Sequence, residues 1–240
     1  MNIIVVGNAK ETGKSALKVI KKTLSNKPNA VICFPTGSSP LPLYQEMVED
    51  FKTNKTNYNQ VVTFNLDEYK GLGSKHPQSY RYFMDTNLFS KINIKEENIN
   101  FPNGVIRDAK EECARYHELL AKNKRDIQIL GIGSNGHIAF NEPGTSFDSI
   151  THVVSLSAST IRDNSRFFDS IQEVPKQAIT MGLSEIMDSE TIILIATGIN
   201  KAHAVLDMIK GPISEECPAS ILQKHKNVIV ILDKEAASLL

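Results

Sequence analysis

The stretch Thr191-Ile192-Ile193-Leu194-Ile195-Ala196 is followed at once by Thr197-Gly198-Ile199-Asn200-Lys201. Its first six residues form a nearly continuous apolar run that is rich in β-branched side chains. A strand with one face in water alternates apolar and polar residues, whereas a strand buried on both faces of a parallel sheet does not. The run therefore predicts a strand inside a parallel sheet, and the glycine-containing segment after it predicts a junction between this strand and a helix.

Six further runs of this kind are spread along the chain, namely Ile3–Val6, Ala30–Phe34, Val61–Phe64, Ile127–Leu130, His152–Leu156 and Val228–Leu232. Between them apolar residues recur at helical spacing, as Leu17, Ile20 and Leu24 do. Strands that alternate with helices predict an α/β fold, with a doubly wound, mainly parallel sheet of Rossmann-like type and helices on both faces. Because 240 residues fit one large domain, we expect residues 1–240 to form a single domain.

Composition narrows the class of protein. Lys+Arg and Asp+Glu both number 27, and a nucleic-acid-binding domain would normally show a basic excess. The three cysteines are far apart and form no C-x-x-C pair, which favours free thiols in a reducing compartment. The N-terminus has no basic region ahead of an apolar segment, and the longest apolar run is far too short to span a membrane. We therefore expect a cytoplasmic protein with neither a nucleic-acid partner nor a membrane span.

The least regular part of the chain is residues 138–180, where Pro143, Gly144 and Pro175 stand among polar residues. Such a segment is typical of a mobile lid or of an ordinary surface loop, and the pattern favours the two interpretations equally. The lid interpretation covers about residues 145–182.

Two glycine-containing segments resemble nucleotide-binding motifs without satisfying them. In residues 8–15 the first glycine of a P-loop is missing, because Gly7 comes one position too early, so an ordinary helix start is favoured. Gly131-x-Gly133-x-x-Gly136 matches a dinucleotide fingerprint, but that motif must open a helix, and here Pro143 follows without helical periodicity. The histidines form no H-E-x-x-H motif and no i, i+4 pair, so we expect neither a metal nor a cofactor.

The loop Thr36-Gly37-Ser38-Ser39 lies between a predicted strand and a predicted helix. In open α/β sheets ligands bind beyond the carboxyl ends of the strands. Three hydroxyls and a glycine at a helix N-terminus predict an anion cradle, and a simple helix cap with a turn is an equally good interpretation. Lys201 and Arg166 are candidate cations for a phosphate group, although many such lysines are merely solvated.

Asp67 and Glu68 follow the run Val61–Phe64. Adjacent carboxylates at the end of a strand point in different directions, so one of them can face a ligand pocket. A carboxylate whose pKa is adjusted by burial can abstract a proton next to a carbonyl group. Taken alone, the pair is more often an acidic turn.

His137 lies in a glycine-rich loop after another predicted strand. Histidine transfers protons near neutral pH, and Glu142, five residues further on, is placed to orient the ring. A lone histidine is more often structural, but the flanking glycines and the location at the end of a strand favour a catalytic role.

Together these segments resemble the glucosamine-6-phosphate deaminase (isomerase) family. The matching pieces run in the family's order over nearly the whole chain: Pro35–Pro40, Val62–Tyr69, Asn135–Gly144, Asn164–Phe168, Val174–Gly182, and Gly198 with Lys201-Ala202. The stretch from Gly136 to Pro143 is the most specific of them.

The resemblance implies conversion of glucosamine 6-phosphate and water into fructose 6-phosphate and ammonia, without a cofactor or metal. It implies that Asp67 moves a proton from C2 to C1 of the open sugar. His137 would carry the proton that opens the pyranose ring, oriented by Glu142 and by Asn135. The phosphate would be held by the loop Thr36, Gly37, Ser38 and Ser39 together with Arg166 and Lys201.

Two departures from the family pattern bear on regulation. The family often has aspartate where this chain has Asn135. His152 and Val154 stand where larger members have basic residues for an allosteric effector, and the chain ends at Leu240 without their C-terminal extension. We therefore expect a short, non-allosteric type that is a monomer or a small homo-oligomer. The alternatives are a 6-phosphogluconolactonase-like hydrolase and a sugar-phosphate sensor without catalytic activity.

Overall fold

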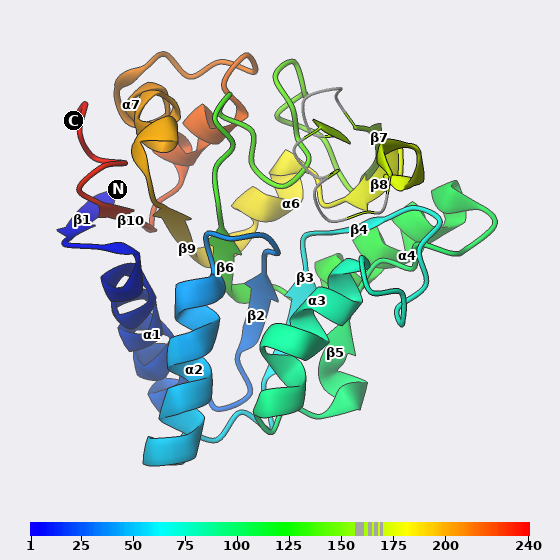
Figure 1. The fold of residues 1–240 in the computed structure, drawn as a ribbon, viewed down its shortest axis with the longest axis horizontal. Helices are drawn as coiled ribbons and strands as arrows, with labels where there is room; N and C mark the ends of the chain where they lie inside the picture. The colour runs from blue at the N-terminus through cyan, green and yellow to red at the C-terminus, as the bar shows by residue number, and fades with distance from the viewer. Residues whose placement is uncertain (157–160, 163–164, 166–167, 169) are drawn as a thin grey trace.

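The computed structural model describes residues 1–240 except 157–160, 163, 164, 166, 167 and 169. In the described part of the chain, seven parallel strands form one sheet. Their order is β1 (Asn2–Val6), β10 (Val228–Asp233), β9 (Ser189–Ala196), β6 (Arg125–Leu130), β2 (Val31–Phe34), β3 (Val62–Asn65) and β5 (Ile99–Asn100). This architecture confirms the predicted doubly wound, mainly parallel sheet. Both chain ends lie at the β1 edge (Figure 1).

Strand β9, in the interior of the sheet, is buried on both faces, as its composition predicts. Ile192, Leu194 and Ala196 belong to one hydrophobic cluster, whereas Ile193 and Ile195 belong to another on the opposite face. Because successive side chains of a strand point to opposite faces, one apolar run supplies both cores.

Helices cover the two faces of the sheet (Figure 1). On one face lie α1 (Ala9–Asn26), α2 (Leu41–Asn54) and α3 (Tyr80–Asn87). On the other lie α4 (Ala109–Lys122), α6 (Leu183–Met187) and α7 (Ala202–Lys210), with the 3-10 helix η5 (Pro218–Lys224). Further 3-10 turns are η1 (Phe89–Lys91), η2 (Glu96–Asn98), η3 (Ile171–Glu173) and η4 (Ile199–Lys201).

Helix starts follow the capping signals of the sequence. Asn8 is the N-cap of α1 and accepts a hydrogen bond from the Glu11 amide, which confirms a helix start in place of a P-loop. Asp108 caps α4 in the same way, through the amides of Lys110 and Glu111.

A small antiparallel sheet stands apart from the main one, with the order β4 (Asp67–Tyr69), β8 (Gln177–Thr180), β7 (His152–Ser155). The run 152–156 thus forms a strand in this sheet rather than in the parallel one. The strands β4, β5 and β8 are too short, and too polar in part, to produce a strand signal. The lid interpretation for residues 145–182 stays a prediction; within that range β8 is largely buried and paired with β4.

The order of the strands creates a topological switch point between β2 and β6. From β2 the chain proceeds through β3 to β5, and from β6 it proceeds through β9 and β10 in the opposite direction. Crossover loops diverge at such a point and leave a crevice at the carboxyl ends of the strands, which is where ligands of open α/β sheets bind.

Candidate active site

A cavity of ≈ 840 Å³ opens at this switch point. It is lined by the loops that follow β2, β3, β6 and β9, and by one side of α3. The cavity brings together most of the residues singled out in the sequence, namely Thr36, Gly37, Ser38, Ser39, Asp67, His137 and Lys201. Arg166 lies outside the described residues.

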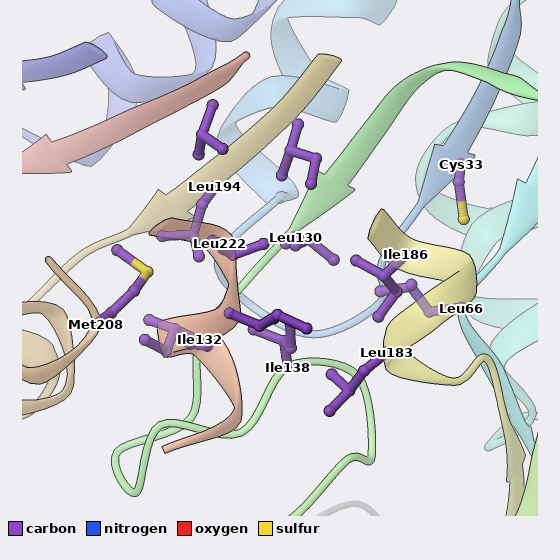
Figure 2. Packing of buried hydrophobic residues seen from close by; sticks show 14 of the residues in the cluster. Cys33, Leu66, Leu130, Ile132, Ile138, Leu183, Ile186, Leu194, Met208 and Leu222 are labelled. Carbon is purple, nitrogen blue, oxygen red and sulfur yellow. The ribbon is translucent and has the colours of Figure 1, made fainter. Parts of the chain in front are cut away.

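The loops that carry Asp67 and His137 are anchored in the hydrophobic core. Leu66, next to Asp67, is 3% exposed, and Ile138, next to His137, is fully buried. Both pack into the cluster on the α4, α6 and α7 face of the sheet, together with Ile132 (Figure 2). Because buried side chains are closely packed, these anchors limit the positions that the two polar residues can take.

Asp67 is buried in the wall of the cavity and is paired with Thr180 across the small sheet. Burial raises the pKa of Asp67 to about 8, and the negative charge of Glu68 acts in the same direction. A carboxyl group that titrates near neutral pH can both take up and release a proton during a reaction.

Glu68 points to the other side of β4 and has a different environment. Its carboxylate accepts hydrogen bonds from the backbone amides of Tyr69, Tyr80 and Arg81. The sequence predicted that one of the two carboxylates can face a pocket, and Asp67 is the one that lines the cavity.

His137 is held in a tight turn that depends on two glycines. The Gly133 amide donates to the His137 carbonyl oxygen at 2.9 Å, and a Cβ on Gly133 would lie 2.3 Å from the imidazole ring. Gly136 has a φ of +84°, which L residues rarely adopt. The fingerprint-like glycines therefore shape a histidine loop and do not open a dinucleotide site.

Glu142 lies beside the imidazole, with its Oε2 atom 3.6 Å from Nδ1 of His137. Among the described residues, Nδ1 has no hydrogen-bond partner. The two groups are close enough for the carboxylate to orient the ring and to stabilise its protonated form.

Asn135 acts on Glu142 and on the backbone. Its amide donates to Oε2 of Glu142 at 2.7 Å, and its oxygen accepts from the backbone N–H of His137 at 3.3 Å. The resemblance implies that Glu142 and Asn135 both orient the imidazole, and in the structure Glu142 lies beside the ring while Asn135 bonds Glu142. The side chain of Asn135 thus holds Glu142 and the turn.

The hydroxyl-rich loop after β2 also lines the cavity. The N-cap of α2 is Pro40, and no side chain caps this helix, so the hydroxyls of Ser38 and Ser39 are not used as caps. Gly37 has a φ of +90°, which lets the loop turn tightly in front of the helix. This observation favours the anion-cradle interpretation over the helix-cap interpretation.

Lys201 reaches the same cavity from the end of β9. The segment before it is fixed because the Gly198 amide donates to both carboxylate oxygens of Asp233, at 3.1 and 3.0 Å. A cation facing a hydroxyl-rich loop suits a phosphate ester.

Several aromatic residues that line the cavity were not singled out as site residues in the sequence. Tyr69, Tyr80, Phe140 and Phe168 form an aromatic wall, with the Tyr69 and Tyr80 rings 4.5 Å apart. Tyr69, Phe140 and Phe168 lie within the pieces that match the family, but their residue type alone gives no sign of a role, because isolated aromatic residues are usually core residues.

The described residues hold no cluster of three or more histidine, cysteine, aspartate or glutamate side chains that could hold a metal ion. Within the same residues no helix is long and apolar enough to cross a membrane.

Fold and cavity together define the class: an α/β protein that brings a buried carboxyl group, a histidine and a hydroxyl-rich loop into one cavity at the switch point of its parallel sheet. Residues 7–231 match the family of glucosamine-6-phosphate isomerases/6-phosphogluconolactonase, and the chain belongs to this family.

Relatives within the family are similar over their whole length. The glucosamine-6-phosphate deaminase of Thermoanaerobacter sp. (strain X514) is 49% identical over 241 residues, which cover 100% of this chain and 95% of the relative. That of Lactobacillus delbrueckii subsp. bulgaricus is 50% identical over 240 residues, with 100% of both chains covered.

Solved structures separate the two branches of the family. A monomeric glucosamine-6-phosphate deaminase has a TM-score of 0.97 at 42% identity, with 100% of both chains covered. The 6-phosphogluconolactonase of Trypanosoma brucei has a TM-score of 0.83 at 18% identity, covering 100% of this chain and 98% of that one. The second likeness shows the fold alone.

Proposed function

We propose that this chain is a glucosamine-6-phosphate deaminase, which converts glucosamine 6-phosphate and water into fructose 6-phosphate and ammonia. The observation that carries the proposal is a buried Asp67, with its pKa raised to about 8, in the same cavity as His137 and the hydroxyl-rich loop. Full-length identity of about half to enzymes of this name supports the substrate.

The phosphate binds at the loop Thr36–Ser39 and Lys201, where a dianion meets hydroxyl donors and a cation. Arg166 is included among the phosphate-binding residues because it lies in the family-matching piece Asn164–Phe168. With the phosphate fixed there, the sugar extends through the cavity toward Asp67 and His137.

His137 carries the proton that moves from the anomeric hydroxyl to the ring oxygen, so the pyranose opens to an aldehyde. Glu142, 3.6 Å from the imidazole, stabilises the transient imidazolium. Asn135 holds Glu142 in position through its 2.7 Å hydrogen bond.

Asp67 in its ionised form removes the proton from C2, while the carbonyl oxygen at C1 gains a proton and the ammonium group at C2 loses one, which gives an enolamine. Asp67 then returns its proton to C1, which leaves an alcohol at C1 and an imine at C2. Water adds to C2 and ammonia leaves, which yields the ketone of fructose 6-phosphate. No step in this sequence requires a redox cofactor, because the oxidation at C2 balances the reduction at C1.

The remaining parts of the proposal concern the state of the protein. A monomer without allosteric activation fits the non-basic residue Val154 on β7 and the monomeric structural relative. A cytoplasmic location fits a sugar-phosphate substrate.

The experiment is incubation of the purified protein with glucosamine 6-phosphate, with fructose 6-phosphate and ammonia measured together. We expect both products in equal amounts, and their loss in Asp67→Asn. Hydrolysis of 6-phosphogluconolactone without any ammonia from the amino sugar would overturn the proposal.

A further inference from the structure

Glu68 is a buried carboxylate outside the cavity whose hydrogen bonds join two walls of the site. It is 2% exposed, and its Oε1 accepts from the amides of Tyr69 at 2.8 Å and Tyr80 at 2.9 Å. Its Oε2 accepts from the Arg81 amide at 2.9 Å. Burial of a carboxylate without such partners would be strongly unfavourable.

Two of these donors belong to the first turn of α3. The next amide, that of Tyr82, donates to the hydroxyl of the N-cap Ser79, so Glu68 and Ser79 divide the first-turn donors between them. One side of α3 lines the cavity through Ser79, Tyr80, Tyr82, Phe83, Thr86 and Asn87. Glu68 therefore fixes this wall relative to β4, the strand that carries Asp67.

The same geometry decides where a negative charge is stable. Burial raises the pKa of Glu68, but three backbone donors oppose the rise. The positive end of the α3 dipole also lowers the pKa of Glu68, because it favours the ionised carboxylate. For Asp67 the main causes are burial and the charge of Glu68, both of which raise its pKa. Of the two adjacent carboxyl groups, Glu68 is thus the more easily ionised.

The other groups that face Asp67 come from four elements and from across the cavity. Burial raises the pKa of Cys33 on β2, Tyr44 on α2, Tyr69 on β4 and Tyr80 on α3, so these groups are neutral near pH 7. His137 and Lys201 line the same cavity as Asp67. The charge that raises the pKa of Asp67 comes from Glu68.

We propose that Glu68 is a positioning residue for the reaction: its fixed carboxylate holds α3 against β4 and keeps the proton of the carboxyl pair on Asp67. This inference rests on the proposed function of Asp67 as the base. As a consequence, Asp67 is protonated in the free enzyme at neutral pH. Asp67 ionises, and can then act as the base, as the pH rises.

A direct test that needs no substrate is a titration of side-chain carboxyl groups by ¹³C NMR in the whole protein. We expect one of the two resonances to titrate well above the other, and the higher titration to vanish in Asp67→Asn. If the higher titration persists in Asp67→Asn, the proton lies on Glu68 and the inference is overturned. Because this result does not depend on turnover, it stands apart from the test of the deaminase activity.

A second test compares Glu68→Gln with Ser79→Ala. Both variants weaken the capping of α3, but only Glu68→Gln removes a charge beside Asp67. We expect Glu68→Gln to move the acidic limb of kcat/KM for glucosamine 6-phosphate downward by roughly one pH unit, and Ser79→Ala to leave its midpoint in place. If the midpoint of the acidic limb moved equally in both variants, or did not move in Glu68→Gln, the charge of Glu68 would not set the protonation of Asp67. Either result would refute the inference.

Discussion

Asn141 donates its side-chain amide to the Met181 carbonyl oxygen at 2.9 Å, and the Met181 amide donates to the Leu66 carbonyl oxygen at 2.7 Å. The first bond reaches the loop of His137 and Glu142, and the second reaches the residue before Asp67. Thr180 makes a parallel link, because its hydroxyl accepts from the Phe140 amide at 3.2 Å while its backbone pairs with Asp67. The end of β8 thus connects the loop of His137 and Glu142 to the segment that carries Asp67.

The hydroxyl of Thr180 provides the simplest test of this link. Thr180→Val keeps the shape and the strand preference but leaves the buried Phe140 amide without its acceptor, at a cost of about 1–3 kcal/mol. We expect kcat for glucosamine 6-phosphate to fall by roughly 10–100-fold with little change in KM, because the misplaced groups act on the chemical step. Steady-state kinetics measures both constants.

Thr180→Ser is the matched control, since it restores the hydroxyl while lacking the methyl group. Recovery of most of the kcat in this variant is the expected result. If Thr180→Val and Thr180→Ser were equally impaired, packing of the methyl group rather than the hydrogen bond would position the loop.

The parallel sheet could be predicted from the sequence because each of its longer strands is an apolar run long enough to be recognised. The run 191–196 fills both faces of the sheet, and no alternative element fits it. The short strands β4 and β8 could not be predicted in this way. Their pairing depends on contacts between residues 67–69 and 178–180, more than a hundred positions apart.

Asp67 is predicted to make the protein less stable as the pH rises. Its pKa in the folded state, about 8, is above the unfolded value of about 4, so the folded state holds the proton more tightly. Its contribution to stability is fully present below pH ~4 and is lost as the pH rises through about 8. Asp67→Asn does not titrate, and we expect its stability advantage over the wild type to grow by up to about 4 kcal/mol from pH 5 to pH 8.

Urea denaturation of both proteins at the two pH values measures this difference, and the same samples give the activity. We expect Asp67→Asn to lose roughly 10²–10⁴-fold in kcat while gaining stability. An advantage that stayed constant from pH 5 to pH 8 would mean that Asp67 is already ionised in the folded protein.

Site residues could be predicted only where the residue itself or its neighbours in the sequence point to a function. His137 stands out through its glycines, and the family motif adds Asp67 and Glu142. The contacts of Asn135 were not predictable, because the turn at Gly136 directs its amide toward Glu142, a choice that depends on the backbone. The hydroxyl loop was ambiguous until α2 was seen to begin at Pro40 without a side-chain cap.

Lys201→Ala is predicted to raise KM for glucosamine 6-phosphate by roughly 10–100-fold, because a charge-assisted hydrogen bond to a phosphate is worth about 1.5–3 kcal/mol. Lys210→Ala is the control, since Lys210 lies at the other end of α7 and bonds the carbonyl oxygen of Leu240. If Lys201→Ala left KM unchanged, or raised it no more than Lys210→Ala does, Lys201 would not bind the phosphate.

Asn135→Asp tests the electrostatics of the histidine loop. The side-chain amide of Asn135 lies 2.7 Å from Oε2 of Glu142. An aspartate at this position would replace that amide with a second carboxylate beside Glu142. The added negative charge beside the imidazole favours its protonated form, and the backbone N–H of His137 still finds an acceptor. We expect the variant to stay active, with the imidazole of His137 losing its proton at a higher pH than in the wild type. NMR titration of the histidine ring protons in both proteins between pH 5 and 9 measures the shift, and a titration that stayed in place or moved down would mean that position 135 only shapes the turn.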